Sequence, residues 1–127
     1  MSINEPAPRW PPVLTADGYV LTGICGRNTE RYNPANGVWT TAGNSPVQLS
    51  DSSGASPSHE VGPQVLRADG TVVFFSGVVT GAVAGTAIFN TSNLTWGTGS
   101  NLPTINGQNY GLADAPAAWL PSGNILI

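Results

Sequence analysis

An internal repeat restricts the fold of this chain more than any other feature. The segments "PPVLTADG" (Pro11–Gly18), "PQVLRADG" (Pro63–Gly70) and "PAAWLPSG" (Pro116–Gly123) share one frame of eight residues, and their closing glycines are 52 and 53 residues apart. Each segment is followed at once by an apolar stretch: "YVLTGI", "TVVFFSG" and "NILI". A unit that recurs at such a period indicates a fold built from similar supersecondary units that bury their faces against one another.

A second block repeats within the first two units. "YNPANGVWTT" (Tyr32–Thr41) matches "FNTSNLTWGT" (Phe89–Thr98), with an aromatic-Asn pair and then Asn, Trp and Thr at the same offsets. These blocks are 57 residues apart, so the second unit is longer between its two blocks. The additional residues fall in the glycine-rich stretch "GVVTGAVAGTA".

That stretch belongs to a run of nineteen uncharged residues, Thr71–Phe89, which is long enough for a membrane-spanning helix. The first half of the run, however, recurs in the first unit as "DGYVLTG", in a segment too short to cross a bilayer. We therefore expect a strand, a glycine-rich loop and a second strand, and no membrane span.

The expected elements are short antiparallel strands. "ADG" is a tight-turn signal, so Gly18 and Gly70 should occupy equivalent turns with positive φ. The β-branched and aromatic residues after each turn favour a strand. Because the run Thr71–Ser76 is apolar and does not alternate with polar residues, both faces of this strand should be covered by protein. The expected strands of the first unit are Val13–Gly23, Thr29–Asn33, Gly37–Thr41 and a weaker one within Val47–Ser58; those of the second are Val65–Ser76, Thr86–Asn90, Leu94–Thr98 and Gln108–Ala113.

The predicted fold class is all-β. A four-stranded antiparallel unit that recurs about every 50 residues is the signature of a β-propeller blade. The predicted organisation is a leader at residues 1–10, blade repeats at residues 11–62 and 63–115, and the inner strand of an incomplete third blade at residues 116–127. Trp39 and Trp96 should lie between neighbouring blades, where a large ring fills the widening space.

Composition excludes several functions. The chain has no lysine and a net charge of −3 with four arginines, so it offers neither Schiff-base chemistry nor a basic surface for nucleic acid. One cysteine and one histidine permit no internal disulfide and no His-rich metal cluster. The N-terminal segment lacks the basic start and apolar core of a secretory signal. We expect no cofactor and no metal, and the sequence assigns no compartment.

Several segments resemble kelch-type β-propeller repeats. "LRADGTVVFFSG" followed by "TAIFNTSNLTW" resembles the kelch pattern, "YNPANGVWT" is similar to its turn and Trp, and "DAPAAWLPSGNILI" is nearest to the bacterial and galactose-oxidase-like branch. The resemblance covers nearly all of residues 11–127. The apolar strands end in "GICG" and in the single Gly77, where the family pattern has paired glycines. A galactose-oxidase-like copper site would need two tyrosines, two histidines and a modified cysteine, and one histidine cannot supply it.

Four residues are candidates for binding. Ligands of propellers bind where loops leading into the inner strands converge, and these loops carry His59 and Glu60 in one repeat and Tyr110 and Asp114 in the next. The chain has no G-x-S-x-G elbow, and a polar loop accounts for "DSSGASPSHE" without a catalytic triad. The sequence thus predicts a binding or assembly module with no catalytic site of its own. The alternative is a fragment of a carbohydrate-active or oxidase-type propeller enzyme whose catalytic residues lie elsewhere.

The expected partners are further propeller blades. The chain stops at "NILI", an apolar strand without following partners, so the missing blades should come from a longer chain, another polypeptide or copies of the chain itself. A glycan or a protein is the expected class of ligand.

Overall fold

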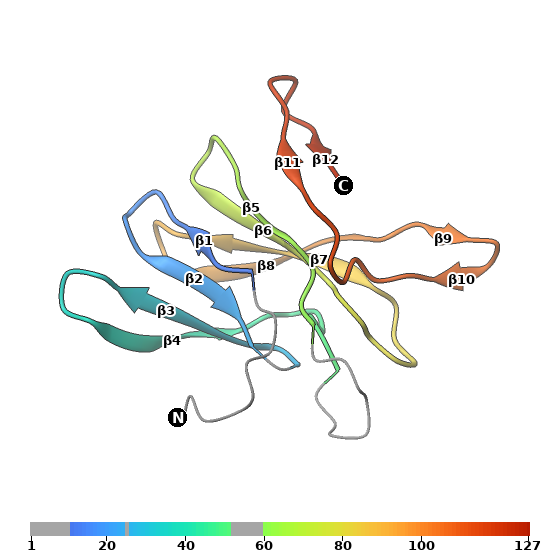
Figure 1. Ribbon diagram of the computed structural model, residues 1–127, viewed down its shortest axis with the longest axis horizontal. Helices are drawn as coiled ribbons and strands as arrows, with labels where there is room; N and C mark the ends of the chain where they lie inside the picture. The colour runs from blue at the N-terminus through green and yellow to red at the C-terminus, as the bar shows by residue number, and fades with distance from the viewer. Residues whose placement is uncertain (1–10, 25, 52–59) are drawn as a thin grey trace.

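The fold is that of a computed structural model, which describes residues 11–24, 26–51 and 60–127. Every regular element within these ranges is a β-strand, so the all-β prediction is confirmed. The strands form two four-stranded antiparallel sheets and two separate two-stranded hairpins (Figure 1).

Both four-stranded sheets run in chain order, β1-β2-β3-β4 and β5-β6-β7-β8. The first sheet consists of β1 (Val13–Leu14), β2 (Val20–Gly23), β3 (Asn28–Asn33) and β4 (Val38–Asn44). The second consists of β5 (Gln64–Leu66), β6 (Thr71–Phe75), β7 (Gly85–Asn90) and β8 (Thr95–Asn101). The hairpins are β9 (Thr104–Ile105) with β10 (Gln108–Asn109), and β11 (Ala118–Trp119) with β12 (Ile125–Leu126).

The repeated glycines close three equivalent hairpin turns. Gly18, Gly70 and Gly123 have φ values of 82°, 79° and 85°, in the left-handed region that favours glycine. The Gly18 N–H donates to the Thr15 carbonyl over 3.0 Å, and the Thr15 N–H donates to the Tyr19 carbonyl over 2.8 Å. The turns at Gly70 and Gly123 repeat both bonds. The prediction of equivalent turns with positive φ at Gly18 and Gly70 is confirmed.

These turns correct three strand predictions. Val13–Gly23 and Val65–Ser76, each expected as one strand, are hairpins, because the Asp-Gly turn reverses the chain between β1 and β2 and between β5 and β6. Residues 116–127, expected as a single inner strand, form the β11–β12 hairpin in the same way. The long apolar runs are therefore central strands, β2 and β6, with neighbours on both sides.

The expected fourth strands lie outside the sheets. Residues 47–51 form no strand, and the rest of Val47–Ser58 lies outside the described residues. Of Gln108–Ala113 only Gln108–Asn109 is a strand, and it pairs with β9 instead of the second sheet. Asn106 and Gly107, with φ of 52° and 74°, form the two-residue turn of that hairpin, which projects away from both sheets in Figure 1. The other four predicted strands correspond to β3, β4, β7 and β8.

The sheets stack face to face. One core cluster joins the two sheets, and its buried members are Leu21, Ala42, Leu49, Val61, Val72, Phe74, Ala87 and Phe89. A second joins the opposite face of the second sheet to the last hairpin through Val65, Val73 and Phe75 with Ala117, Trp119 and Ile125. Both faces of β6 are thus covered, as its apolar run predicts. The edge strands β1, β5 and β11 contact one another in succession.

Trp96 connects the two sheets directly. Its ring lies 5.0 Å from that of Phe74 and 4.9 Å from that of Phe89, between ring centroids. Its indole N–H donates to the Ala42 carbonyl of the first sheet over 2.8 Å. The expectation that Trp96 lies between two sheets is correct. Trp39, for which the same was expected, is 45% exposed, and no second sheet within the described residues covers it.

We expect Gly18→Val to lower the free energy of unfolding by about 1 kcal/mol or more, through backbone strain at positive φ. No atom lies within 4 Å of a Cβ added at Gly18, so the cost would not come from a clash. Urea titration measures the change. Ala68→Val, at an exposed position of the equivalent turn, is the control with a smaller expected effect. Equal effects of the two substitutions would contradict the turn assignment.

Trp96→Ala should lower the free energy of unfolding by about 3 kcal/mol, because it removes a large ring between two sheets and its hydrogen bond. Trp39→Ala, at the equivalent and more exposed position, should cost about 1 kcal/mol, chiefly the Tyr32 ring contact. The two variants are compared by the same denaturant titration. A cost at Trp39 as large as that at Trp96 would be inconsistent with this packing.

Candidate functional site

Three segments of the chain meet at the end of β6, around Ser76. The Ser76 hydroxyl donates to the Gln48 carbonyl over 2.7 Å and accepts the Gly85 N–H over 3.1 Å. Its own carbonyl accepts the Leu112 N–H over 2.8 Å. Ser76 is fully buried, and these bonds join the segment after β4, the β6–β7 loop and the segment after β10. We call this place the junction.

Glycines let the backbones touch at the junction. A Cβ on Gly77 would lie 1.9 Å from the Glu60 carbonyl oxygen, and a Cβ on Gly111 would lie 1.5 Å from the Gly77 carbonyl oxygen. No real Cβ approaches another atom so closely, so both positions require glycine. The single glycine that ends the apolar run therefore allows close backbone packing.

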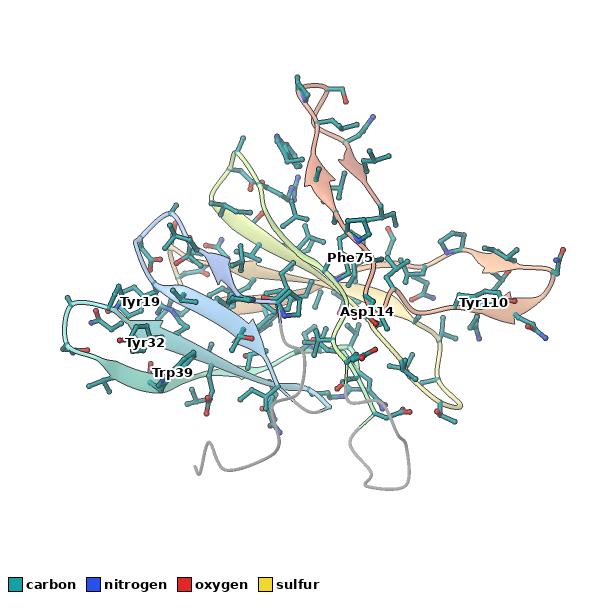
Figure 2. The ribbon with its side chains drawn as sticks, viewed as in Figure 1. Tyr19, Tyr32, Trp39, Phe75, Tyr110 and Asp114 are labelled. Carbon is teal, nitrogen blue, oxygen red and sulfur yellow. The ribbon has the colours of Figure 1, made fainter. Side chains whose placement is uncertain are left out.

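Two of the predicted binding residues belong to segments that this junction brings together. The Glu60 carbonyl accepts the Val78 N–H over 3.3 Å. Asp114 is exposed, has a φ of 56° and lies in a turn in which the Ala115 N–H donates to the Leu112 carbonyl over 3.3 Å. Both segments thus border the same end of β6, and Figure 2 shows Asp114 below Phe75, near the centre of the molecule.

Of the other two predicted residues, Tyr110 does not join them. Tyr110 is 48% exposed, and its hydroxyl donates to Gln108 Oε1 over 3.0 Å within the same segment. Figure 2 shows it next to the β9–β10 hairpin, well away from Asp114. His59 lies outside the described residues. Tyr110 is separated because the Asn106-Gly107 turn folds its segment into an independent hairpin.

Asp51 is a structural anchor of the junction that the sequence prediction missed. It is 4% exposed, and its carboxylate accepts the Thr80 N–H and the Thr80 hydroxyl, each over 2.7 Å. Its own N–H donates to the Val78 carbonyl over 2.8 Å. These bonds hold the glycine-rich β6–β7 loop against the segment that leaves the first sheet. Asp51 begins the polar stretch "DSSGASPSHE", and nothing local marks it as a partner of a residue 29 positions away.

Charged groups elsewhere stabilise the turns of the sheets. Arg31, 8% exposed, donates to the Asp17 carboxylate over 2.5 Å, and its guanidinium lies 4.0 Å from the centre of the Tyr19 ring. In the second sheet, hydrogen bonds from the Thr71 hydroxyl and N–H lower the pKa of Asp69 below its usual value, with a smaller contribution from a nearby arginine. The lowered pKa of Asp69 stabilises the folded state. This stabilisation is present above the unfolded-state pKa of Asp69 and is lost as the pH falls through the lower folded-state value.

The first sheet carries a row of apolar side chains, exposed at its two ends and half-buried between them, on the face turned away from the second sheet. Its members pair across successive strands, Leu14 with Val20, Val20 with Tyr32 and Tyr32 with Trp39. We call these four residues the outer row. Leu14 is 63% exposed, and the rings of Tyr32 and Trp39 lie 5.1 Å apart (Figure 2). A cross-strand row of this kind is a candidate interaction surface.

Comparison with protein-family models, with curated proteins and with solved structures gives no match. Within the described ranges, no three His, Cys, Asp or Glu side chains are grouped as metal ligands. The same ranges hold no helix that is long and apolar enough to span a membrane. The outer row and the junction are therefore the two candidate sites that this part of the chain presents.

Replacing Asp51 by Ala should lower the free energy of unfolding by about 1–2 kcal/mol, because the Thr80 N–H and hydroxyl both lose their acceptor. Exchange of the Thr80 amide hydrogen should accelerate. Thr80→Val removes only the hydroxyl bond, keeps the shape of the side chain, and should cost about half as much. If Asp51→Ala left both stability and exchange unchanged, Asp51 would not anchor the loop.

Proposed function

We propose that this chain is an assembly module of a kelch-like β-propeller. In this proposal the two four-stranded sheets are successive blades, and the β11–β12 hairpin begins a third. The module acts by stacking on further blades and has no catalytic site of its own. The observation that carries the proposal is that successive units pack on one another through the same positions of the repeat.

Those positions can be followed across the units. The counterparts of the outer row in the second sheet also pair in succession, and we call them the inner row: Leu66, Val72, Phe89 and Trp96. The inner row packs on the first sheet. In the last hairpin, Trp119 and Ile125 hold the positions of Leu66 and Val72, and they pack on the second sheet. Each unit therefore turns the same face towards the unit before it.

The arrangement of the strands supports a blade assembly in a second way. The first strands of the three units, β1, β5 and β11, contact one another in succession, while the Trp of each four-stranded sheet lies on its fourth strand. A radial arrangement requires units that converge at their first strands and are held apart by large rings at their fourth strands. The kelch resemblance of the sequence agrees with this arrangement.

A module of this kind leaves an apolar face open at each end of its stack. Leu14 and Trp39 are exposed at one end, and Leu126, which is 59% exposed, lies at the other. Contiguous apolar surface of this kind drives association in solution. The function proposed is therefore association with blades supplied by a longer polypeptide, another protein or further copies of the chain.

Light scattering coupled to size-exclusion chromatography tests this proposal. We expect an apparent mass that exceeds 13.0 kDa and increases with protein concentration, because the open faces find partners. Tyr110→Ala, on the projecting hairpin segment and away from the stacking faces, should leave the mass distribution unchanged. A stable, monodisperse monomer of 13.0 kDa would refute the assembly function.

A further inference from the structure

The outer row and the inner row have the same register but opposite environments. In the inner row Val72 and Phe89 are fully buried, and the indole N–H of Trp96 is bonded. In the outer row Leu14 is 63% exposed and Trp39 is 45% exposed. Within the described residues, the inner row therefore has a sheet packed on it and the outer row has none.

The partner of the inner row is known in detail. The first sheet packs against the inner row with Val13 from β1, Leu21 from β2 and Ala42 from β4. Leu49 and Val61 join the same contact. Leu21 and Leu49 have no exposed surface, so the contact is dry. The fourth strand supplies the small Ala42, whose carbonyl accepts the Trp96 indole N–H. A partner that reaches the Trp therefore needs a fourth strand.

Resting on the function proposed above, we infer that the outer row is the docking surface for a four-stranded sheet of the same repeat type. That sheet packs an aliphatic face on the outer row. A main-chain carbonyl of its fourth strand accepts the indole N–H of Trp39. Its first two strands supply counterparts of Val13 and Leu21 to cover Leu14 and Val20.

The last hairpin of a second copy would fit less well. Its open face carries Ala118 and Leu126, which hold the repeat positions of Val13 and Leu21. It could cover Leu14 and Val20, which lie on the first two strands of the first sheet. Within the described residues it has two strands, which offer no counterpart of Ala42 and would leave Trp39 uncovered. The exposed aromatic end of the row therefore favours a complete sheet.

Two positions beside the row distinguish its partner from the first sheet. Thr22 and Glu30 pair across strands where the second sheet pairs Phe74 and Ala87. The face that receives the partner is therefore more polar than the face of the inner row. A partner that matches it supplies a hydrogen-bond donor or a cation opposite Glu30, in addition to the aliphatic surface.

The test duplicates residues 11–62 in place within the full chain, so that residue 62 of the first copy precedes residue 11 of the second. Pro11 and Pro63 hold the same position in the repeat, so this joint reproduces the natural one. The first copy can then cover the outer row of the second. We expect the indole hydrogen of Trp39 in the second copy to exchange at least about tenfold more slowly than in the unduplicated chain.

Matched substitutions locate the effect. Trp39→Ala in the second copy should lower the urea midpoint of unfolding well below that of the duplicated parent, whereas Trp39→Ala in the first copy should change it little. A further duplicated chain carries Thr22→Phe and Glu30→Ala in its second copy, which makes that face resemble the face of the inner row. We expect this chain to protect the Trp39 indole more strongly still.

Equal effects of Trp39→Ala in the two copies, with an unprotected indole, would overturn the inference. Docking only after Thr22→Phe and Glu30→Ala would overturn it too, because the natural face would then not accept such a sheet. We expect oligomers of the unduplicated chain to persist in Trp39→Ser, because the last hairpin of a second copy reaches Leu14 and Val20 but not Trp39. Oligomers that Trp39→Ser dissolved would make a second copy the occupant of the whole row and would overturn the inference. A stable monomer of the unduplicated chain would instead refute the assembly function, so the two failures are distinguishable.

Discussion

The contact of Trp96 with the first sheet is the interaction on which the structure depends. Several strands are only two residues long, and isolated two-stranded hairpins are marginally stable in water. The backbone bonds of each sheet therefore do not suffice, and the apolar faces must be removed from water. The Trp96 ring fills the space between the sheets, and its hydrogen bond to Ala42 sets their relative position.

Much of this fold is predictable because its signals are local. The Asp-Gly turns, the apolar runs and the aromatic-Asn and Trp blocks mark the repeat, and the turns at Gly18 and Gly70 have the expected positive φ. The predicted strand bounds were wrong where the pairing between strands determines them. "VL" before the turn is too short to be recognised as a strand, and it becomes β1 only because β2 folds back on it. Whether Gln108–Asn109 joins the second sheet likewise depends on a turn, not on strand propensity.

The junction was predictable only in part, for the same reason. Convergence of the loops brings the segments of Glu60 and Asp114 to one end of β6, but Tyr110 belongs to a separate hairpin. What holds the junction together is non-local: Asp51 bonds Thr80, and the Gly77 backbone touches those of Glu60 and Gly111. A residue pattern within one segment carries no information about such contacts. Glycine in "FFSG" signals a close approach, without identifying the group that approaches.

Repetition brings a risk that the units of this chain avoid by differing from one another. Faces with identical side chains could pair in the wrong order, so specificity requires polar groups that suit one neighbour only. Arg31 occupies the position that Ile88 holds in the second sheet. It is buried and pairs with Asp17 of the same unit, so this face carries a charged pair that its counterpart lacks. Thr22 and Glu30 similarly make the outward face of the first sheet unlike its counterpart. The apolar rows supply the attraction between the units, and these polar residues make the two sheets unequal as packing partners.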